Sequence, residues 1–280
     1  LVVCHAAVAL DPNKSIGQYI HHAWQTEDGL PDSLVTSIIQ THEGYLLFGT
    51  HRGLVRFDGV RFAVFDRRNT PGLTTDSIDA VCEDASGTLW VGGAAGLHRF
   101  NGGRLGPRGR GATLTSNPVQ SIVEAPAGGV WFGTAEHGAG LVMVDEIKPL
   151  TTAQGLSSDK VRALCVDHEG SVWIGTFEGG LNRYRDGIVT VFTTKDGLAS
   201  NNVQAVHEDR NGTLWVGTDS GLSSLKDGKF SSYTVRDGLT VNSVRALTED
   251  SFGSLWVATF GGLNRFRDGR FSSFTSSTGL

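Results

Sequence analysis

A short phrase built around Trp-Val-Gly-Thr constrains this sequence more than any other feature. One copy reads Gly-Thr-Leu-Trp-Val-Gly-Thr at residues 212–218, and related copies recur along the chain. A repeat of about 40 residues built from short strands is the signature of a β-propeller. The Trp position, which is Leu in the first copy, advances by 41 to 43 residues each time and falls at Leu47, Trp90, Trp131, Trp173, Trp215 and Trp256.

Each repeat can be read as four strands, which we call A to D in chain order. In the fifth repeat these are residues 203–208, 213–218, 222–226 and 229–235, and Asp227-Gly228 is a strong hairpin signal between the last two. Strand B is apolar on both faces, so it needs sheets stacked on either side. The sequence therefore predicts an all-β propeller with six complete four-stranded blades, one for each repeat.

Both ends of the sequence predict part of a seventh blade. Residues 19–30 align with 230–239, which places an orphan outer strand before the first repeat, and Gly279-Leu280 matches the start of another repeat. In a closed propeller, such a strand completes the last blade. We expect residues 16–280 to form one propeller domain that stops before blade seven, and a further repeat of about 35 residues to stabilise it.

Residues 1–15 are interpreted as a signal-peptide remnant and leader. The sequence begins at Leu1, its only Met is Met143, and Ala7-Val8-Ala9 fits a small-x-small cleavage site. This pattern favours export over an apolar leader without meaning. No apolar stretch approaches the ~20 residues that span a bilayer. The net charge of −5, without a basic run, argues against nucleic acid as a partner.

The repeats resemble those of the two-component regulator propeller family. The resemblance covers residues 28–280 and is carried by the phrase Asn-Asn-Val-Gln-Ala-Val-His-Glu-Asp-Arg-Asn-Gly-Thr-Leu-Trp-Val-Gly-Thr at 201–218, followed by Gly221-Leu222. It implies the periplasmic sensor part of a bacterial inner-membrane signalling protein. It also implies partner segments outside this chain: a second propeller, a β-domain, a membrane helix and a histidine kinase or diguanylate cyclase. Some members sense saccharides, but the family has no single set of binding residues to carry over.

The candidate ligand site lies in the loops from strand B to C and from strand D to the next A. Both kinds of loop flank the same ends of the strands, and they vary between repeats while the strands stay nearly uniform. Variable residues on a repeated scaffold are where binding tends to reside. We expect a small ligand, in particular an oligosaccharide, to bind there without chemistry. The candidate residues are Arg52, Glu136, Phe177, Glu178, Asn201, Asp219, Asn242 and Phe260.

The alternative for each of these residues is a purely local role. Asn and Asp in such loops often accept hydrogen bonds from their own backbone, and each Phe can pack against a neighbouring blade. A polar series one step into each strand A has a similar ambiguity, because it can line the channel or bond between blades. Its members are Thr36, Asp79, Gln120, Arg162, Gln204 and Arg245.

Two other classes of function stay open. A protein-interaction scaffold would present a flat rim with an apolar patch instead of a polar-aromatic pocket, and a homodimer is one form of such association. A propeller glycoside hydrolase or lyase is the other class. However, the stretch from Asp84 to Trp90 places Gly87 three residues after the Asp, where a sialidase Asp-box has it two residues after. Glu136-His137 is the only tempting acid-base dipeptide.

No catalytic residue, metal site or cofactor is expected. Neither a nucleophile, nor a metal cage, nor a paired general acid and base recurs at a recognisable spacing. Cys82 and Cys165 fall at the same register of two repeats and are expected to be buried free thiols.

Overall fold

The computed structural model describes residues 23–101, 104–105, 116–143 and 146–278. The described residues fall into two compact units. The first unit comprises residues 23–177 and 182–191, and the second comprises 178–181 and 192–278. The predicted signal-peptide remnant at 1–15 lies outside the described residues, as do residues 19–22 of the predicted orphan strand, while Thr26–Asp28 after it is a 3-10 turn.

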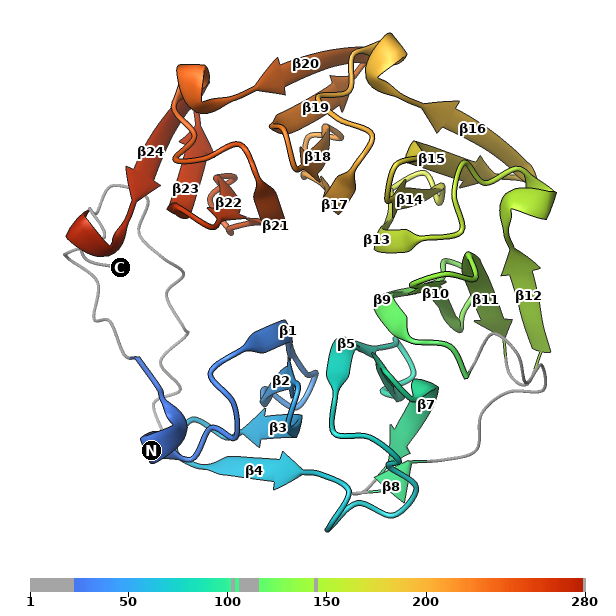
Figure 1. The fold of residues 1–280 in the computed structure, drawn as a ribbon, viewed down its shortest axis with the longest axis vertical. Coiled ribbons are helices and arrows are strands. Elements are labelled where there is room, and N and C mark those ends of the chain that lie inside the picture. The colour runs from blue at the N-terminus through green and yellow to red at the C-terminus, as the bar shows by residue number, and fades with distance from the viewer. Residues whose placement is uncertain (1–22, 102–103, 106–115, 144–145, 279–280) are drawn as a thin grey trace, which may run out of the picture. The chain divides into compact units, whose positions relative to one another are not determined.

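The first unit contains three complete four-stranded antiparallel sheets and most of a fourth (Figure 1). In each sheet, consecutive strands pair in chain order, and Gly180, Leu181 and Phe192 are the residues of the fourth sheet that belong to the second unit. The strands are β1 (Val35–Gln40), β2 (Leu46–Thr50), β3 (Gly53–Phe57), β4 (Phe62–Phe65), β5 (Ile78–Glu83), β6 (Leu89–Gly93), β7 (Gly96–Asn101), β8 (Arg104–Leu105), β9 (Val119–Glu124), β10 (Val130–Thr134), β11 (Ala139–Met143), β12 (Glu146–Leu150), β13 (Val161–Val166), β14 (Val172–Thr176), β15 (Gly180–Arg185) and β16 (Ile188–Phe192).

The second unit contains the fifth and sixth sheets, which have the same strand order. Their strands are β17 (Val203–Glu208), β18 (Leu214–Thr218), β19 (Leu222–Lys226), β20 (Lys229–Tyr233), β21 (Val244–Glu249), β22 (Leu255–Thr259), β23 (Gly262–Arg267) and β24 (Arg270–Phe274). The predicted fold class is therefore confirmed: the chain is a β-propeller with six four-stranded blades.

The Trp side chain of strand B is buried and is anchored by a hydrogen bond. Trp215 is 5% exposed and packs with Val244, Leu255 and Val257 of the next blade. Its indole Nε1 donates to Asp209 Oδ2 over 2.9 Å. The same bond forms in the second, fourth and sixth blades, as Trp90 to Asp84, Trp173 to Asp167 and Trp256 to Asp250. The predicted burial is confirmed for all five strand-B Trp residues, and Trp90, Trp131 and Trp215 pack against the next blade as predicted.

The Asp of this pair also builds the turn between strands A and B. Asp84 Oδ1 accepts hydrogen bonds from the backbone of Ser86 and Thr88, while its other oxygen accepts from Trp90. Burial raises the pKa of Asp84, but the hydrogen bonds from Ser86, Trp90 and Thr88 outweigh it and hold the pKa below its usual value. The carboxylate that resembles part of an Asp-box is thus used for local structure.

Neighbouring blades within each unit meet through their innermost strands. In the first unit β1 lies beside β5, β5 beside β9 and β9 beside β13, and in the second unit β17 lies beside β21. The first residue of strand A is buried at these contacts: Ile78 is 2% exposed, and Val119, Val161 and Val244 are 0% exposed. Stacked blades therefore share one closely packed inner layer.

The first blade differs at this position. Val35 is 39% exposed and Ile38 is 59% exposed, although Ile78 and Val81 at the equivalent positions of the second blade are 2% and 6% exposed. The repeat thus presents an apolar stacking face on strand β1. The seventh blade stays a prediction, and this face is the surface against which a further blade would pack.

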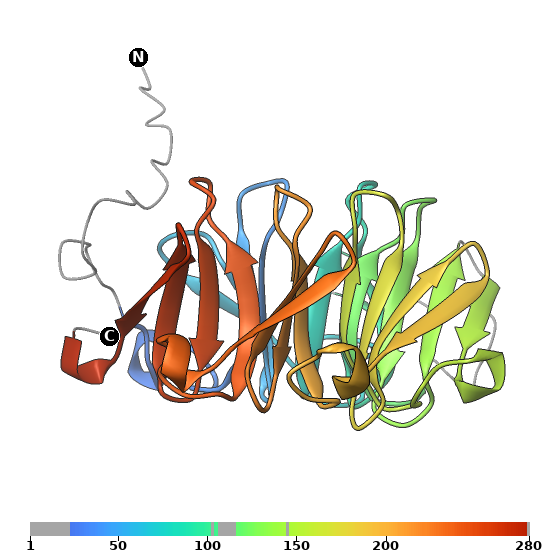
Figure 2. The same ribbon diagram turned by 90° about the horizontal axis from the view of Figure 1, so that it is seen from above.

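A short turn follows strand D, and the four-strand interpretation of the sequence did not predict it. Thr194–Asp196 and Val235–Asp237 are single 3-10 turns, each closed by a capping box and by a glycine in the left-handed region. Gly197 has φ +105° and Gly238 has φ +114°, which explains why Gly-Leu recurs before strand A in most repeats, for example at residues 197–198 and 238–239. Figure 2 shows such turns at one end of the blades within each unit.

We predict that Trp215→Ala lowers the free energy of unfolding by about 3–5 kcal/mol, because it leaves a cavity between two blades. Trp215→Phe keeps most of the packing but removes the donor to Asp209, so it should cost about 1 kcal/mol. Urea or thermal unfolding measures both. An unchanged midpoint for Trp215→Ala would contradict the inter-blade role of this residue.

Candidate functional site

Backbone hydrogen bonds bring the two kinds of variable loop together at one end of the blades. The first residue of a B-to-C loop donates its N–H to a carbonyl oxygen of the D-to-A loop that precedes the same blade. These bonds run from Ala94 to Ser77 (3.3 Å), from Ala135 to Pro118 (3.0 Å), from Phe177 to Lys160 (2.9 Å) and from Asp219 to Asn202 (3.3 Å).

The Thr at the end of strand B shapes each B-to-C loop. Thr218 is fully buried, and its hydroxyl donates to Gly221 O over 2.8 Å and accepts from Ser220 N over 3.2 Å. Thr50 and Thr259 make the equivalent bonds. The repeated Gly-Thr therefore fixes the loop backbone and leaves the loop side chains free to vary.

A β-bulge places the polar series of strand A. The strand pairing shifts register at the second residue of strand A in each blade, so one residue of strand A has no partner on strand B. A bulge re-aims the side chain of its extra residue, and such bulges often lie next to functional sites. Sequence periodicity singled out the polar series but not the bulge. The bulged residues are Thr36, Asp79, Gln120, Arg162, Gln204 and Arg245.

In the sixth blade, the bulge and the loop together form an exposed aromatic platform. The Phe260 side chain is 74% exposed, so it does not pack against a neighbouring blade. The Arg245 guanidinium carbon lies 4.3 Å from the centre of the Phe260 ring, and its Nη1 donates to Gln204 Oε1 over 3.1 Å. One ring face is occupied by Arg245, while most of the ring remains open to solvent. A ring of this kind can stack on the apolar face of a sugar.

The fourth blade repeats the arrangement with a less exposed ring. Phe177 is half-buried, with the Lys160 ammonium 5.4 Å and the Arg162 guanidinium 5.5 Å from its ring centre. Arg162 occupies the bulge position, as Arg245 does in the sixth blade. The two platforms belong to different units.

Asn201 and Asn242 have the local role that the sequence left open as the alternative. Asn242 Oδ1 accepts a hydrogen bond from Val235 N over 2.9 Å, and Asn201 Oδ1 accepts from Thr194 N over 2.9 Å. Asp159 closes the preceding loop in the same way, through Thr152 N. These side chains thus clasp the D-to-A loops, meaning that each Oδ1 atom accepts a hydrogen bond from the backbone of its own loop. The same Oδ1 atoms are therefore less available to a ligand.

The acidic candidates divide into two groups. Asp219 accepts from Asn202 Nδ2 over 2.7 Å and from Ser220 Oγ over 2.9 Å. Burial raises its pKa, but hydrogen bonds from Ser200, Asn202 and Ser220 outweigh this effect and hold the pKa below its usual value. Glu136 and Glu178 are exposed, and their carboxylates have no hydrogen-bond or ion-pair partner among the described residues. Glu178 has φ +64°, and its N–H donates to Asn202 Oδ1.

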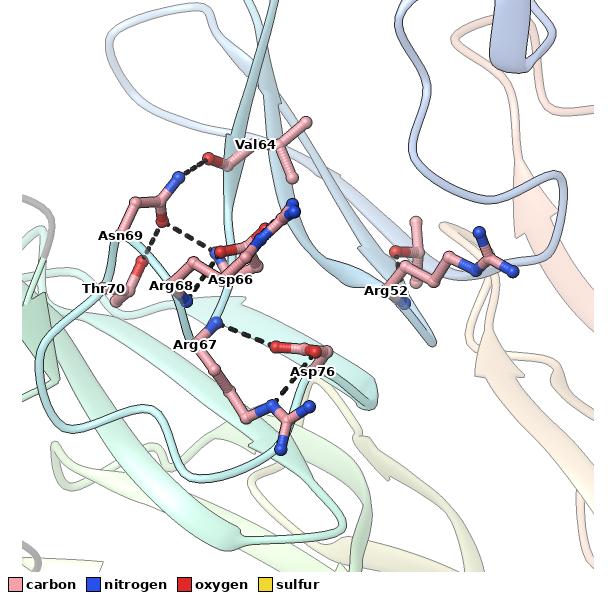
Figure 3. A network of polar contacts seen from close by, with 9 residues as sticks. Arg52, Val64, Asp66, Arg67, Arg68, Asn69, Thr70 and Asp76 are labelled. Carbon is pink, nitrogen blue, oxygen red and sulfur yellow. Dashed lines mark hydrogen bonds and ion pairs between the residues drawn. The ribbon is translucent and has the colours of Figure 1, made fainter.

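Arg52 lines a cavity of about 740 Å³ between the first B-to-C loop and the D-to-A loop that follows (Figure 3). The charged groups of that second loop pair with one another. Arg67 Nε donates to Asp76 Oδ2 over 3.1 Å, and Arg68 forms two hydrogen bonds with Asp66. The hydrogen bonds from Arg68 hold the pKa of Asp66 below its usual value. Figure 3 shows the Arg52 guanidinium pointing away from these pairs.

His51 precedes Arg52 in the same loop and faces the bulge residue of the second blade. His51 Nε2 lies 3.6 Å from Asp79 Oδ1. Burial raises the pKa of Asp79, and the nearby His51 opposes that shift. In contrast, Cys82 on the same strand is a free thiol whose pKa is raised to about 11 by burial.

The described residues contain no group of His, Cys, Asp and Glu side chains arranged to hold a metal ion. Over the same ranges of the chain, no helix is long and apolar enough to cross a bilayer. The arrangement at the loop end therefore offers aromatic stacking, guanidinium donors and carboxylate acceptors, which are the means of binding a polar ring.

Comparison with known proteins places the repeats in a family. The profile described as "Two component regulator propeller" matches residues 72–95, 113–136, 155–178, 197–220 and 238–261. A search of curated proteins found no match.

Solved structures share the fold. The extracellular domain of the hybrid two-component system BT3049 from B. thetaiotaomicron is 24% identical, with a TM-score of 0.83. That alignment covers 92% of this chain and 36% of the other, so this chain spans about a third of that domain. The corresponding BT4673 domain is 20% identical over 86% of this chain and 43% of the other, with a TM-score of 0.58. Virginiamycin B lyase from Staphylococcus aureus is 12% identical over 86% of this chain and 84% of its own, with a TM-score of 0.72.

We predict that Asn242→Ala and Asn201→Ala each lower the free energy of unfolding by about 1 kcal/mol, because each leaves a loop N–H without its acceptor. Glu136→Ala serves as the matched control, since its exposed carboxylate has no partner, and it should stay within about 0.5 kcal/mol of the parent. Chemical unfolding of the three variants makes the comparison. Equal stability of all three variants would show that the two Asn side chains do not stabilise their loops.

Proposed function

We propose that this chain, whose repeats belong to the two-component regulator propeller family, is the extracytoplasmic ligand-sensing propeller of a bacterial two-component-type signalling protein. The ligand is a saccharide or another small polar molecule, and it is bound without chemistry at the loop end of the blades. The likeness to extracellular domains of hybrid two-component systems supports this assignment. The output, a kinase or cyclase, belongs to segments outside this chain.

One observation carries the binding part of the proposal. Phe260 exposes 74% of its side chain at the variable end of a blade, and Arg245 holds one face of the ring. A ring beside hydrogen-bonding groups suits a molecule with one apolar and one polar face. Sugars have that character.

The enzyme alternative has less support from the site. The Asp residues that recur in the A-to-B turns accept hydrogen bonds from Trp and from the turn backbone, so they are used structurally. Glu136 is exposed, and the residue after it, His137, donates its backbone N–H to Thr134 Oγ1. The lyase likeness is to a protein only 12% identical, which concerns the fold alone.

A protein-interaction scaffold is the second candidate, because one specific surface favours it. Leu34, Val35 and Ile38 are 53%, 39% and 59% exposed on and beside strand β1. This is a flat apolar strip on the face where a blade would otherwise stack. A partner protein that covers it would bind by apolar contact and would be indifferent to the loop-end residues.

A calorimetric titration with a panel of neutral and acidic oligosaccharides tests the sensor proposal. We expect Phe260→Ala to weaken binding about tenfold, which corresponds to about 1.4 kcal/mol for one stacked ring. Phe252→Ala is the matched control, because Phe252 is 43% exposed in the A-to-B turn of the same blade. Equal heats for both variants, or turnover of any sugar, would count against a binding sensor. Self-association of the protein is measured alongside. If Ile38→Asp abolishes it and the loop-end variants do not, the result would favour the scaffold.

A further inference from the structure

Both Phe residues at the loop end, the exposed Phe260 and the half-buried Phe177, are accompanied by cationic side chains of their own blade. Arg245 lies 4.3 Å from the Phe260 ring centre in the second unit. In the first unit, Lys160 and Arg162 lie 5.4 and 5.5 Å from the Phe177 ring centre. The bulge holds Thr36, Asp79, Gln120 or Gln204 in the blades whose B-to-C loop begins with a residue other than Phe.

These cations have unused hydrogen-bonding capacity. A guanidinium has five N–H donors, and Arg245 uses one of them, from Nη1 to Gln204 Oε1. Within the described part of the chain, Lys160, Arg162 and Arg245 form no ion pair with a carboxylate. A cation beside an aromatic ring keeps the N–H groups that point away from the ring free to bond to another molecule.

Three acidic groups at this end are engaged by other side chains, whereas Glu136 and Glu178 are exposed and unpaired among the described residues. Asp66 and Asp76 pair with Arg68 and Arg67, and Asp219 accepts from Asn202 and Ser220. The chain as a whole carries a net charge of −5, so unpaired cations beside two aromatic rings are not a consequence of composition. Beside Phe260 the remaining unpaired charge is that of Arg245, whereas beside Phe177 the cations Lys160 and Arg162 are accompanied by the exposed carboxylate of Glu178.

We propose that the Phe–cation platforms select a carboxylate-bearing saccharide. This inference rests on the sensor function proposed above and specifies the class of its ligand. The ring face of the sugar stacks on the open side of Phe260, and its carboxylate receives N–H bonds from the edge of Arg245. A planar carboxylate matches the guanidinium fork, which adds orientation to the attraction. The Phe177 platform offers the same two contacts through Arg162 and Lys160.

Matched pairs of saccharides test the inference. The probes are oligogalacturonate against its methyl ester, and a glucuronate-containing oligosaccharide against its carboxyl-reduced form. We expect the acidic member of at least one pair to bind about tenfold more tightly than its neutral partner. We expect this preference to shrink as ionic strength rises, because salt screens exposed charges.

Single variants assign the preference to the platform. Arg245→Gln keeps a polar side chain but removes the charge, so it should weaken the acidic member about tenfold and leave the neutral member nearly unchanged. Arg162→Gln tests the other platform in the same way. Arg267→Gln is the matched control, since Arg267 is a cation at the far end of strand β23 in the same blade. The thermal midpoint of each variant verifies its fold.

The outcomes separate the two proposals. If neither member of any pair binds, the saccharide-sensor function is wrong and the ligand class falls with it. If neutral and acidic members bind equally, or if Arg245→Gln and Arg162→Gln both leave the acidic preference intact, the sensor function stands and the selection of a carboxylate is wrong. A selective loss in Arg245→Gln or Arg162→Gln supports both.

Discussion

The close approach of strand B to strand A of the next blade is the contact on which the structure depends. A Cβ added to Gly92 would lie 2.6 Å from Val119 Cγ1, and one added to Gly133 would lie 2.4 Å from Val161 Cγ1. In the second unit, a Cβ on Gly217 would lie 2.5 Å from Val244 Cγ1. Only glycine fits at these distances, so the Gly in Trp-Val-Gly-Thr is fixed by blade spacing. The buried Trp stands two residues before this Gly, on the same face of the strand, and fills the space between the sheets.

This constraint confines variation to the strand ends and separates the two ends of the blades. At the A-to-B end, polar groups tie neighbouring blades together: Glu83 accepts from His42 N, Glu124 from Ala85 N and Glu249 from Arg210 N. At the loop end, backbone hydrogen bonds and buried Thr hydroxyls hold the loops, so side chains such as Phe260 are not needed to maintain the loop structure. A bulge in every strand A adds one further variable residue beside each loop. Binding residues can therefore change there without disturbing the stack of blades.

The sequence predicted what repeats, because repeated residues answer repeated physical demands. The blade number, the strand order and the buried Trp residues followed from the period and from the apolar pattern of strand B. The roles of individual loop residues did not follow. Asn201 and Phe260 were both candidate binding residues of the loops, yet one bonds to the backbone of its own loop and the other is exposed beside Arg245. What separates them is backbone geometry: a hydrogen bond between residues seven positions apart holds the Asn201 loop, and a bulge lies beside Phe260. The bulge leaves no signal in hydropathy, whereas the recurring Asp or Asn at the Asn201 position is a signal for the loop bond.

The sixth blade departs from the glycine rule in a way that bears on signalling. Ala258 stands where the other blades have Gly, so a residue that packs against β22 must be smaller than Val or lie farther away. Phe260 follows two residues later, beyond the end of the same strand. A ligand can shift a conformational equilibrium only through different affinity for two arrangements. Because Ala258 and Phe260 belong to strand β22 and the loop that follows it, a ligand that contacts Phe260 differently in two arrangements of this strand would shift the balance between them.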